Sequence, residues 1–291
     1  ASNKVYDTTV TATLGGTATV TALGSDVLSV GGTAAGVFAD KNVGTGKTIT
    51  VSGVTLGGTD AGNYNLLQQT GLTADITKAD LAVTGLTVSN KVYDASTTAT
   101  LGGTAAVSAL SGDTVTVGGT AVGAFANKNV GSGKAVSVTG VTIGGTDAGN
   151  YNLVQQTGLT ADITAKSITI SGTTASNSVY NAGTVATLVT TSSALTSGAS
   201  ASNDNKYYSV DTVTLVKTNA VGAFADKNVG TGKAITVSGF TLSGGDAGNY
   251  NLVQPTGLTA DITKADLAVS GLTASNKVYD TTVTATLGGT A

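Results

Sequence analysis

One ten-residue stretch occurs three times, and this repetition most constrains what the chain can fold into. GGTDAGNYNL covers Gly57–Leu66, returns unchanged at Gly144–Leu153, and appears as SGGDAGNYNL at Ser243–Leu252. Self-similarity at a regular period indicates repeated structural units. A catalytic site is normally present once in a chain, so we interpret this stretch as part of a structural unit that is built three times.

Two shorter motifs follow the same period. KVYD, or its variant SVYN in the third unit, places one tyrosine in each copy, at Tyr6, Tyr93, Tyr180 and Tyr279, with spacings of 87, 87 and 99 residues. KNVG begins at Lys41, Lys128 and Lys227, with spacings of 87 and 99 residues. A unit of this length can form a small domain of its own. The spacings therefore predict three domains, with twelve additional residues (99 − 87) in the third.

The domain boundaries follow from these motifs. Repeat 1 covers residues 1–78 and lacks its first strand, repeat 2 covers 79–165, repeat 3 covers 166–264 with an insertion near 190–208, and a fourth repeat begins at 265–291. Residues 1–18 read ASNKVYDTTVTATLGGTA and are identical to residues 274–291. We therefore expect the chain to be a segment of a longer array.

The composition favours strands over helices. Thr and Val suit pleated surfaces, whereas Gly, which accounts for 41 of 291 residues, suits turns together with Asn, Asp and Ser. Ile49 and Val51 alternate with Thr48 and Thr50, as in a strand with one buried face. We expect an all-β fold of tandem small β-sandwich or β-grasp-like domains, with six or seven strands in each.

Turns and linkers are predicted from short local patterns. We interpret four glycine clusters as turns between strands: Gly15–Gly16, Gly31–Gly32, Gly44–Gly46 and Gly57–Gly58. Between repeats 1 and 2, strands at 74–77 and 80–84 are separated only by Lys78 and Ala79. Such a linker is stiff compared with a Gly/Ser tether, so we expect the domains to form a rod.

The composition also excludes several classes of function. The chain has no His, Cys, Arg or Glu, so the usual acids, bases and nucleophiles of enzymes are absent apart from Asp and Lys. With a net charge of −3 and no arginine, there is no basic patch for nucleic acid. No apolar run in the sequence is long enough to span a membrane.

The stretch GGTDAGNYNL raises the question of a calcium site. Asp60 and Asn63 offer oxygen ligands, but one carboxylate is too few for a good site. We favour a tight connection between strands, in which Asp60 and Asn63 bond the local backbone and Gly62 takes a positive φ. Tyr64 is then expected to anchor the next strand in the core. We predict no resident cofactor, with calcium as the alternative.

The residues expected to anchor each repeat recur with the period. They are the KVYD tyrosines Tyr6, Tyr93, Tyr180 and Tyr279, the phenylalanines Phe38, Phe125 and Phe224, the tyrosines Tyr64, Tyr151 and Tyr250, and the glycines Gly62, Gly149 and Gly248. The insertion of repeat 3 adds Tyr207 and Tyr208, which have no counterparts elsewhere. Adjacent strand residues point to opposite faces, so we consider these two tyrosines candidate contact residues for a sugar or a subunit.

Two further motif hypotheses are weaker. KNVGTGKT at Lys41–Thr48 looks like a phosphate loop, but it lacks the first glycine of that motif and a strand follows it, so a hairpin turn is favoured. An internal isopeptide bond from Lys4 or Lys91 to Asn63 or Asn150 is the second hypothesis. It disagrees with repeat 3, where Ser178 replaces the lysine.

The ordered set KVYD, KNVGTGK and DAGNYNL resembles a known family, the YDG-type repeat of very large bacterial surface adhesins of the filamentous-haemagglutinin kind. The resemblance covers essentially the whole chain. In place of the glycine that the family has after Tyr-Asp, this chain has Thr8, Ala95 and Thr281. The resemblance implies export to the bacterial cell surface, β-rich stalk domains and no enzymatic activity.

Three hypotheses for function remain open. The first is a structural repeat segment of an exported adhesin, which acts as the stalk of a surface or extracellular filament. The second is a self-assembling extracellular filament, sheath or matrix protein, in which one copy's opening strand completes a neighbouring sheet and neighbouring copies are the partners. The third is a glycan-binding module for host or matrix sugars.

Overall fold

The computed structural model describes residues 1–198 and 204–290, which are all-β. These residues divide into two compact units. Unit 1 comprises Ala1–Lys91 and Ser96–Thr164, and unit 2 comprises Val92–Ala95 and Ala165–Ala291. The all-β class predicted from the composition is confirmed, because the described residues contain strands and three single-turn 3-10 helices but no α-helix.

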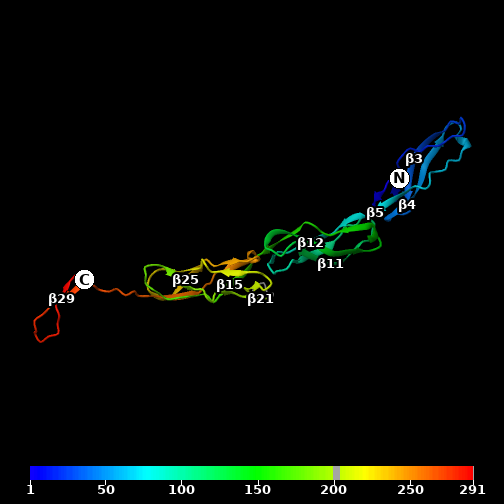
Figure 1. The fold of residues 1–291 in the computed structure, drawn as a ribbon. Coiled ribbons are helices and arrows are strands. Elements are labelled where there is room, and N and C mark those ends of the chain that lie inside the picture. The colour runs from blue at the N-terminus through cyan, green and yellow to red at the C-terminus, as the bar shows by residue number, and fades with distance from the viewer. Residues whose placement is uncertain (199–203, 291) are drawn as a thin grey trace. The chain divides into compact units, whose positions relative to one another are not determined.

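Repeat 1 forms one five-stranded sheet in the order β1-β5-β4-β3-β2. Strand β1 runs parallel to β5, and the other neighbours are antiparallel. The long hairpin of β3 and β4 lies beside β5 in the blue part of Figure 1. The elements are β1 (Lys4–Val5), β2 (Thr11–Ala12), β3 (Ser29–Phe38), β4 (Gly44–Gly57), η1 (Ala61–Asn63) and β5 (Thr73–Thr77).

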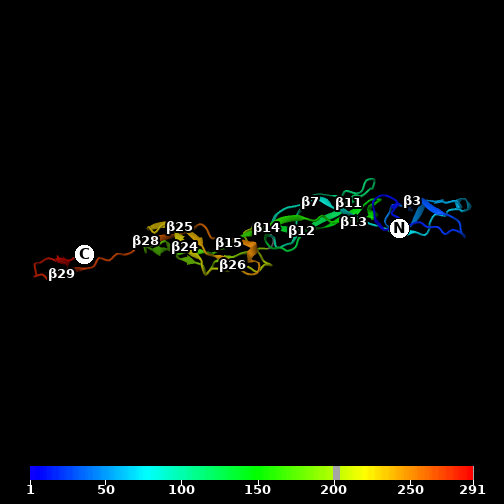
Figure 2. The same ribbon diagram turned by 90° about the horizontal axis from the view of Figure 1, so that it is seen from above.

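Repeat 2 has the same sheet, in the order β8-β14-β12-β11-β9, and adds two short pairings. Strand β6 pairs in parallel with β13, and β7 pairs antiparallel with β10. Figure 2 shows β7 and β13 beside β11 and β12. The elements are β6 (Ala79–Ala82), β7 (Thr84–Val88), β8 (Lys91–Val92), β9 (Thr98–Ala99), β10 (Leu101–Ala106), β11 (Thr116–Phe125), β12 (Gly131–Gly144), η2 (Ala148–Asn150), β13 (Tyr151–Val154) and β14 (Leu159–Thr164).

Repeat 3 again has the five-stranded order, as β17-β28-β25-β24-β18, and its first strand β15 pairs with both β27 and β20. Residues 199–203, within the predicted insertion, lie outside the described residues. The elements are β15 (Lys166–Ser171), β16 (Thr174–Ala175), β17 (Ser178–Val179), β18 (Val185–Ala186), β19 (Leu188–Val189), β20 (Ala194–Leu195), β21 (Ser197–Gly198), β22 (Tyr207–Tyr208), β23 (Thr214–Val216), β24 (Val221–Phe224), β25 (Gly230–Ser238), β26 (Thr241–Ser243), η3 (Ala247–Asn249), β27 (Tyr250–Val253) and β28 (Leu258–Thr263); β29 (Leu272–Ala274) and β30 (Leu287–Gly289) follow.

The alternation seen in the sequence corresponds to the buried face of the sheet. Ile49 and Val51 of β4 are 2% and 7% exposed, and Ile76 of β5 is 1% exposed, whereas Thr48 and Thr50 are exposed. The phenylalanine at the end of the preceding strand is buried in each repeat, at Phe38, Phe125 and Phe224. Each sheet therefore has one apolar face, which must be covered by another layer.

Three local predictions were wrong. Gly44–Gly46 is not a turn but forms the start of β4, where the pairing with β5 shifts between Gly44 and Lys47. Gly31–Gly32 is not a turn but lies inside β3, where the pairing with β4 shifts between Gly32 and Ala35. Gly32 has a φ of 78°, and a Cβ on it would lie 2.2 Å from the carbonyl oxygen of Gly53, so glycine permits a bulge here. The predicted count of six or seven strands was also wrong in every repeat: the described residues form five strands in repeat 1, nine in repeat 2 and fourteen in repeat 3, where many strands, such as β17 and β18, are only two residues long.

The residue after each Tyr-Asp or Tyr-Asn pair has a left-handed backbone. Thr8, Ala95, Ala182 and Thr281 have φ values of 68°, 60°, 66° and 64°. This conformation places Cβ too close to the following carbonyl oxygen in every residue except glycine. The resemblance therefore has a physical basis at this position, because the backbone here is one that glycine adopts without strain.

We predict that Thr8→Gly stabilises repeat 1 by on the order of 1 kcal/mol, because it relieves the left-handed strain of a β-branched residue. Urea unfolding with a probe in repeat 1 measures the change in the free energy of unfolding. Thr8→Ala keeps the Cβ and serves as the control, for which we expect a smaller gain. A loss of stability in the glycine variant would contradict this account of position 8.

Candidate functional site: the joint between repeats

The connection between repeats 1 and 2 is a single residue. Strand β5 ends at Thr77 and β6 begins at Ala79, so only Lys78 lies between them. The apolar core also continues across this connection, since Leu81 and Tyr151 of repeat 2 belong to the same buried cluster as Tyr6, Phe38 and other residues of repeat 1. The two repeats are therefore packed together within unit 1.

An aspartate at the centre of the joint accepts hydrogen bonds from two tyrosines. The Tyr6 hydroxyl donates to Asp113 Oδ2 at 2.7 Å, and the Tyr151 hydroxyl donates to the same oxygen at 2.7 Å. The two rings meet edge to face, with centroids 5.5 Å apart and an interplanar angle of 79°. Tyr6 is 2% exposed and Tyr151 is 3% exposed. The KVYD tyrosine of repeat 1 is thus buried against repeat 2.

The second oxygen of this aspartate accepts from a lysine. Lys41 Nζ lies 2.6 Å from Asp113 Oδ1 and 3.3 Å from Asp147 Oδ1, and it stands 5.8 Å from the centre of the Tyr6 ring. The Asp113 side chain is 0% exposed, whereas that of Lys41 is 33% exposed. A buried carboxylate requires such partners, because an unpaired charge in the interior is strongly unfavourable.

An amide completes the joint. Asn150 Oδ1 accepts from the backbone N–H of Val43 at 2.9 Å, and Asn150 Nδ2 donates to Asn42 Oδ1 at 3.2 Å. Residues of all three repeated motifs therefore meet here: KVYD and KNVG come from repeat 1, and DAGNYNL comes from repeat 2. These motifs recur because each repeat needs the same surfaces to hold its neighbour.

The joint shifts the ionisation of its members. Burial acts to raise the pKa of Asp113, but the hydrogen bonds from Lys41, Tyr6 and Tyr151 outweigh it, so the pKa of Asp113 lies below its ordinary value. Burial and the bond to Asp113 raise the pKa of Tyr6 and of Tyr151. The hydrogen bond to Asp113 raises the pKa of Lys41. A charged carboxylate and lysine with neutral tyrosines is therefore the stable state.

Unit 2 contains a matching pair of tyrosines around Asp211. The hydroxyls of Tyr93 and Tyr250 donate to Asp211 Oδ2 at 2.8 Å and 2.6 Å, and their rings lie 5.4 Å apart. Tyr208 adds a third ring, whose centroid is 6.0 Å from that of Tyr93, and its backbone N–H donates to the Tyr250 hydroxyl at 2.9 Å. Tyr208 is 5% exposed, so this candidate contact residue is part of the cluster, while Tyr207 is half-buried.

Repeat 1 contains its own counterparts of Tyr151 and Asp113, which are Tyr64 and Asp26. The Tyr64 hydroxyl donates to Asp26 Oδ2 at 2.7 Å and accepts from the backbone N–H of Leu23 at 3.0 Å. Asp26 lies 87 residues before Asp113 and is its counterpart. Tyr64 is half-buried.

Several sequence predictions for DAGNYNL are corrected by this geometry. Gly62, Gly149 and Gly248 lie inside the 3-10 turns η1, η2 and η3 and have no positive φ, which belongs instead to Gly58, Gly145 and Gly244. The Asp60 side chain does not cap η1; its Oδ2 accepts from the N–H of Val27 at 2.9 Å, in another loop of the same repeat.

The KVYD tyrosines do not all anchor a core. Tyr6 and Tyr93 are buried, and Tyr6 packs against Tyr151 of repeat 2, whereas Tyr180 is 36% exposed and Tyr279 is 86% exposed. The isopeptide hypothesis finds no support at Lys4, because Lys4 Nζ donates to Asp7 Oδ1 at 2.7 Å.

Three members of these clusters were not predicted from the sequence. Asp113 and Asp211 lie in no repeated motif, and the only available signal was the 87-residue spacing of Asp26 and Asp113. Lys166 is also unexpected: it is 0% exposed, its Nζ lies 2.5 Å from Asp204 Oδ1, and it stands 5.1 Å from the centre of the Tyr208 ring. Lys166 is the counterpart of Ala79 in repeat 2, so repeat 2 has no charged side chain at this position.

No group of three acidic side chains suited to a metal ion occurs in the part of the chain that the structure describes. The side-chain oxygens of Asp60 and Asn150 named above already accept from protein N–H groups. Over residues 1–198 and 204–290, no helix is long and apolar enough to cross a membrane.

We predict that Asp113→Ala opens the joint, because it leaves the Lys41 ammonium and two tyrosine hydroxyls without their acceptor. We expect a loss on the order of 3 kcal/mol in the free energy that protects the Val43 amide from hydrogen exchange. Asp26→Ala is the matched control, since it removes the acceptor of one tyrosine only and leaves the joint intact. Equal loss of protection at Val43 in both variants would contradict the assignment.

We further predict that the joint has an acid limit and an alkaline limit. Because the pKa of Asp113 is lowered from 3.8, its contribution is present above that value and is lost as the pH falls through the lowered pKa. Because the pKa values of Tyr6 and Tyr151 are raised from 10.0, their contribution is lost as the pH rises beyond that value. Val43 amide protection, corrected for intrinsic exchange, measures both limits, and Asp113→Asn is expected to flatten the acid limit. An unchanged acid limit in that variant would exclude Asp113 as its cause.

Comparison with known proteins supports the division into repeats. The family model of the YDG domain matches residues 1–71, 77–158 and 164–257. Neither the curated proteins nor the solved structures give a match. The three matched segments contain the tyrosines, lysines and asparagines of the clusters described above, and together they cover most of the chain. The chain therefore belongs to the YDG domain family, as three consecutive copies of the domain.

Proposed function

We propose that this chain is a structural spacer within a large exported bacterial surface protein of the adhesin type, where tandem YDG domains build a stalk. The observation that carries the proposal is the joint: residues of the repeated motifs bond across the boundary between repeats 1 and 2. A motif that binds one domain to the next allows the array to be built up from consecutive domains.

The chemistry of the joint favours a mechanical role. Asp113 is bonded by Lys41, Tyr6 and Tyr151, so its lone pairs are directed to neighbouring side chains rather than to a substrate. The linker between repeats 1 and 2 is the single residue Lys78, which is too short to act as a flexible tether. Repeats held in this way transmit force and position from one domain to the next.

The composition suits export. A chain with no cysteine cannot form wrong disulfides in an oxidising compartment, and few of its residues are charged, at 11%. Adhesion itself is then carried by another part of the protein or by many weak contacts along the array, because repeated modules multiply weak affinities.

Surface display is tested on intact cells of the source bacterium. Antibodies raised against the 291-residue chain are expected to label intact cells, and removing one whole repeat from the encoded protein is expected to leave labelling in place. Labelling that appears only after the cells are permeabilised would overturn the proposal. Antibodies against a cytoplasmic protein of the same cells serve as the control for integrity.

A further inference from the structure

The two segments through which the chain enters and leaves repeat 2 lie side by side. The entry segment, residues 79–91, follows Lys78 and begins with β6, and the exit segment, residues 151–164, contains β13 and β14. Strands β6 and β13 are parallel neighbours. The N–H of Val83 donates to the carbonyl of Val154 at 2.9 Å, which continues this contact beyond β6.

A second set of bonds joins the far ends of the same two segments. The N–H of Asp162 donates to Asn90 Oδ1 at 2.7 Å, and the Thr164 hydroxyl donates to the carbonyl of Lys91 at 3.3 Å. Here β8 lies beside β14. The equivalent pairs, β1 with β5 in repeat 1 and β17 with β28 in repeat 3, are parallel. The entry and exit segments are therefore joined at both ends.

The direction of these strands determines how repeat 2 responds to tension. Force along the chain reaches the entry segment at its first residue and leaves the exit segment at its last residue, because Lys78 precedes the one and Ala165 follows the other. Since the segments are parallel, this force slides them in opposite directions along their common axis. The bonds between them share the load and must break together. A hairpin that is pulled apart at its open end instead loses its bonds one at a time.

Gln156 adds a side-chain bridge between the same two segments. Its Oε1 accepts from the N–H of Leu86 at 2.8 Å, and its Nε2 donates to the Leu86 carbonyl at 2.9 Å. Gln156 belongs to the exit segment, whereas Leu86 belongs to the entry segment and is 7% exposed. The amide therefore adds two hydrogen bonds that must break when the segments slide.

Repeat 3 lacks this bridge but keeps the same sheet. Pro255 is the counterpart of Gln156, and Thr173 is the counterpart of Leu86. A hollow of about 260 Å³ lies at this place, with Pro255 and Thr173 in its lining. The five-stranded sheet of repeat 3 nevertheless has the same strand order as that of repeat 2. The Gln156 bridge is therefore not needed to form the sheet, and its place between the entry and exit segments points to a role under load.

We propose that repeat 2 resists extension under tension through a shear clamp made of its entry and exit segments, and that Gln156 is part of this clamp. Forced unfolding is governed by the rate at which the native state opens. The clamp sets this rate, because extension first has to separate β6 from β13 and Gln156 from Leu86 together. The inference rests on the proposed spacer role for the source of the tension. The clamp itself is tested on the isolated chain, so its failure would leave the result for surface display unaffected.

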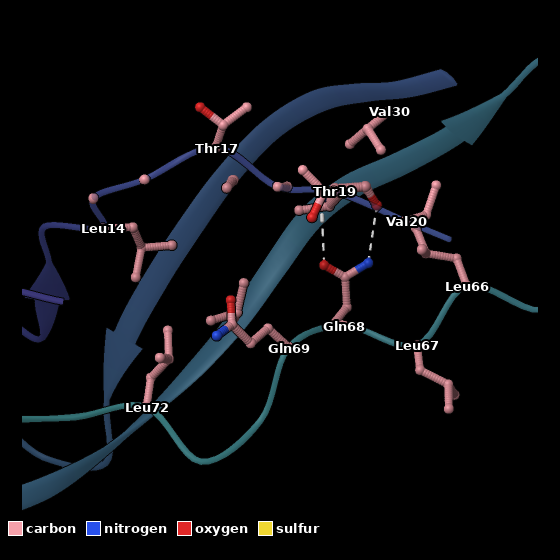
Figure 3. Close-up of a pocket in the computed structure, with 16 residues that line it drawn as sticks. Leu14, Thr17, Thr19, Val20, Val30, Leu66, Leu67, Gln68, Gln69 and Leu72 are labelled. Carbon is pink, nitrogen blue, oxygen red and sulfur yellow. Dashed lines mark hydrogen bonds between the residues drawn. The ribbon is translucent and has the colours of Figure 1, made fainter. Parts of the chain in front are cut away.

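The neighbouring glutamine offers a matched control. Gln155 Oε1 accepts from the N–H of Val141 at 3.3 Å, and Gln155 Nε2 donates to the Val141 carbonyl at 2.8 Å. Val141 lies in β12 rather than in the entry segment. Figure 3 shows the equivalent pair of bonds in repeat 1, from Gln68 to the backbone of β4. Gln155 thus forms the same number of bonds as Gln156 but does not join the two segments.

Single-molecule stretching at constant force tests the clamp. Full-length chains carry Lys78→Cys and Ala165→Cys for the attachment of handles, so the force passes through repeat 2 alone, and the chain has no native cysteine to compete. We expect Gln156→Ala to unfold repeat 2 about tenfold faster than the parent chain, because two hydrogen bonds are lost from the barrier. For Gln155→Ala we expect a change of less than about threefold, because its bonds to β12 persist at the barrier.

Urea unfolding in the absence of force shows that the variants fold and compares their stability. Each variant loses two hydrogen bonds, so we expect similar losses in the free energy of unfolding. A difference between the two variants under force, with Gln156→Ala the faster, supports the clamp. Equal acceleration of both variants, or no acceleration in Gln156→Ala, would overturn the proposal.

Discussion

The structure of unit 1 depends on one buried carboxylate, Asp113, which accepts from Tyr6, Tyr151 and Lys41 at 2.6–2.7 Å. Removing this charge from water is costly, and only close partners with good geometry offset that cost. Those partners come from both sides of the boundary between repeats. Separating the two repeats would leave the carboxylate without these partners. The residues of KVYD and KNVG in one repeat are therefore constrained by their contacts with the next repeat.

Apolar packing and polar bonding act at the same place. The core cluster of repeat 1 extends to Leu81 and Tyr151 of repeat 2, so separating the repeats exposes apolar surface as well as a charge. Hydrophobic contact of this kind supplies most of the attraction, whereas the directional bonds to Asp113 define the orientation. A boundary with both kinds of contact behaves as part of a continuous structure rather than as a hinge between independent domains.

The repeats, the all-β class and the buried faces could be predicted from the sequence because each is written in local patterns, such as the alternation around Ile49 and Val51. The joint could not be predicted, since Tyr6 and Asp113 are 107 residues apart and no local pattern connects them. Each motif was instead given a local explanation. For DAGNYNL, the turn was located correctly, but the positive φ lies at Gly58 rather than Gly62. In repeat 2, Asn150 of the same motif bonds Val43 and Asn42 of the preceding repeat instead.

The central claim is that the KVYD tyrosine of one repeat and the aspartate of the next act as a pair. A double-mutant cycle with Tyr6→Phe and Asp113→Asn, read out by hydrogen exchange at the Val43 amide, measures their coupling directly. We expect a coupling energy of about 1 to 3 kcal/mol, as for residues in one hydrogen-bond network. Effects that add within about 0.3 to 0.5 kcal/mol, as for independent sites, would contradict the account.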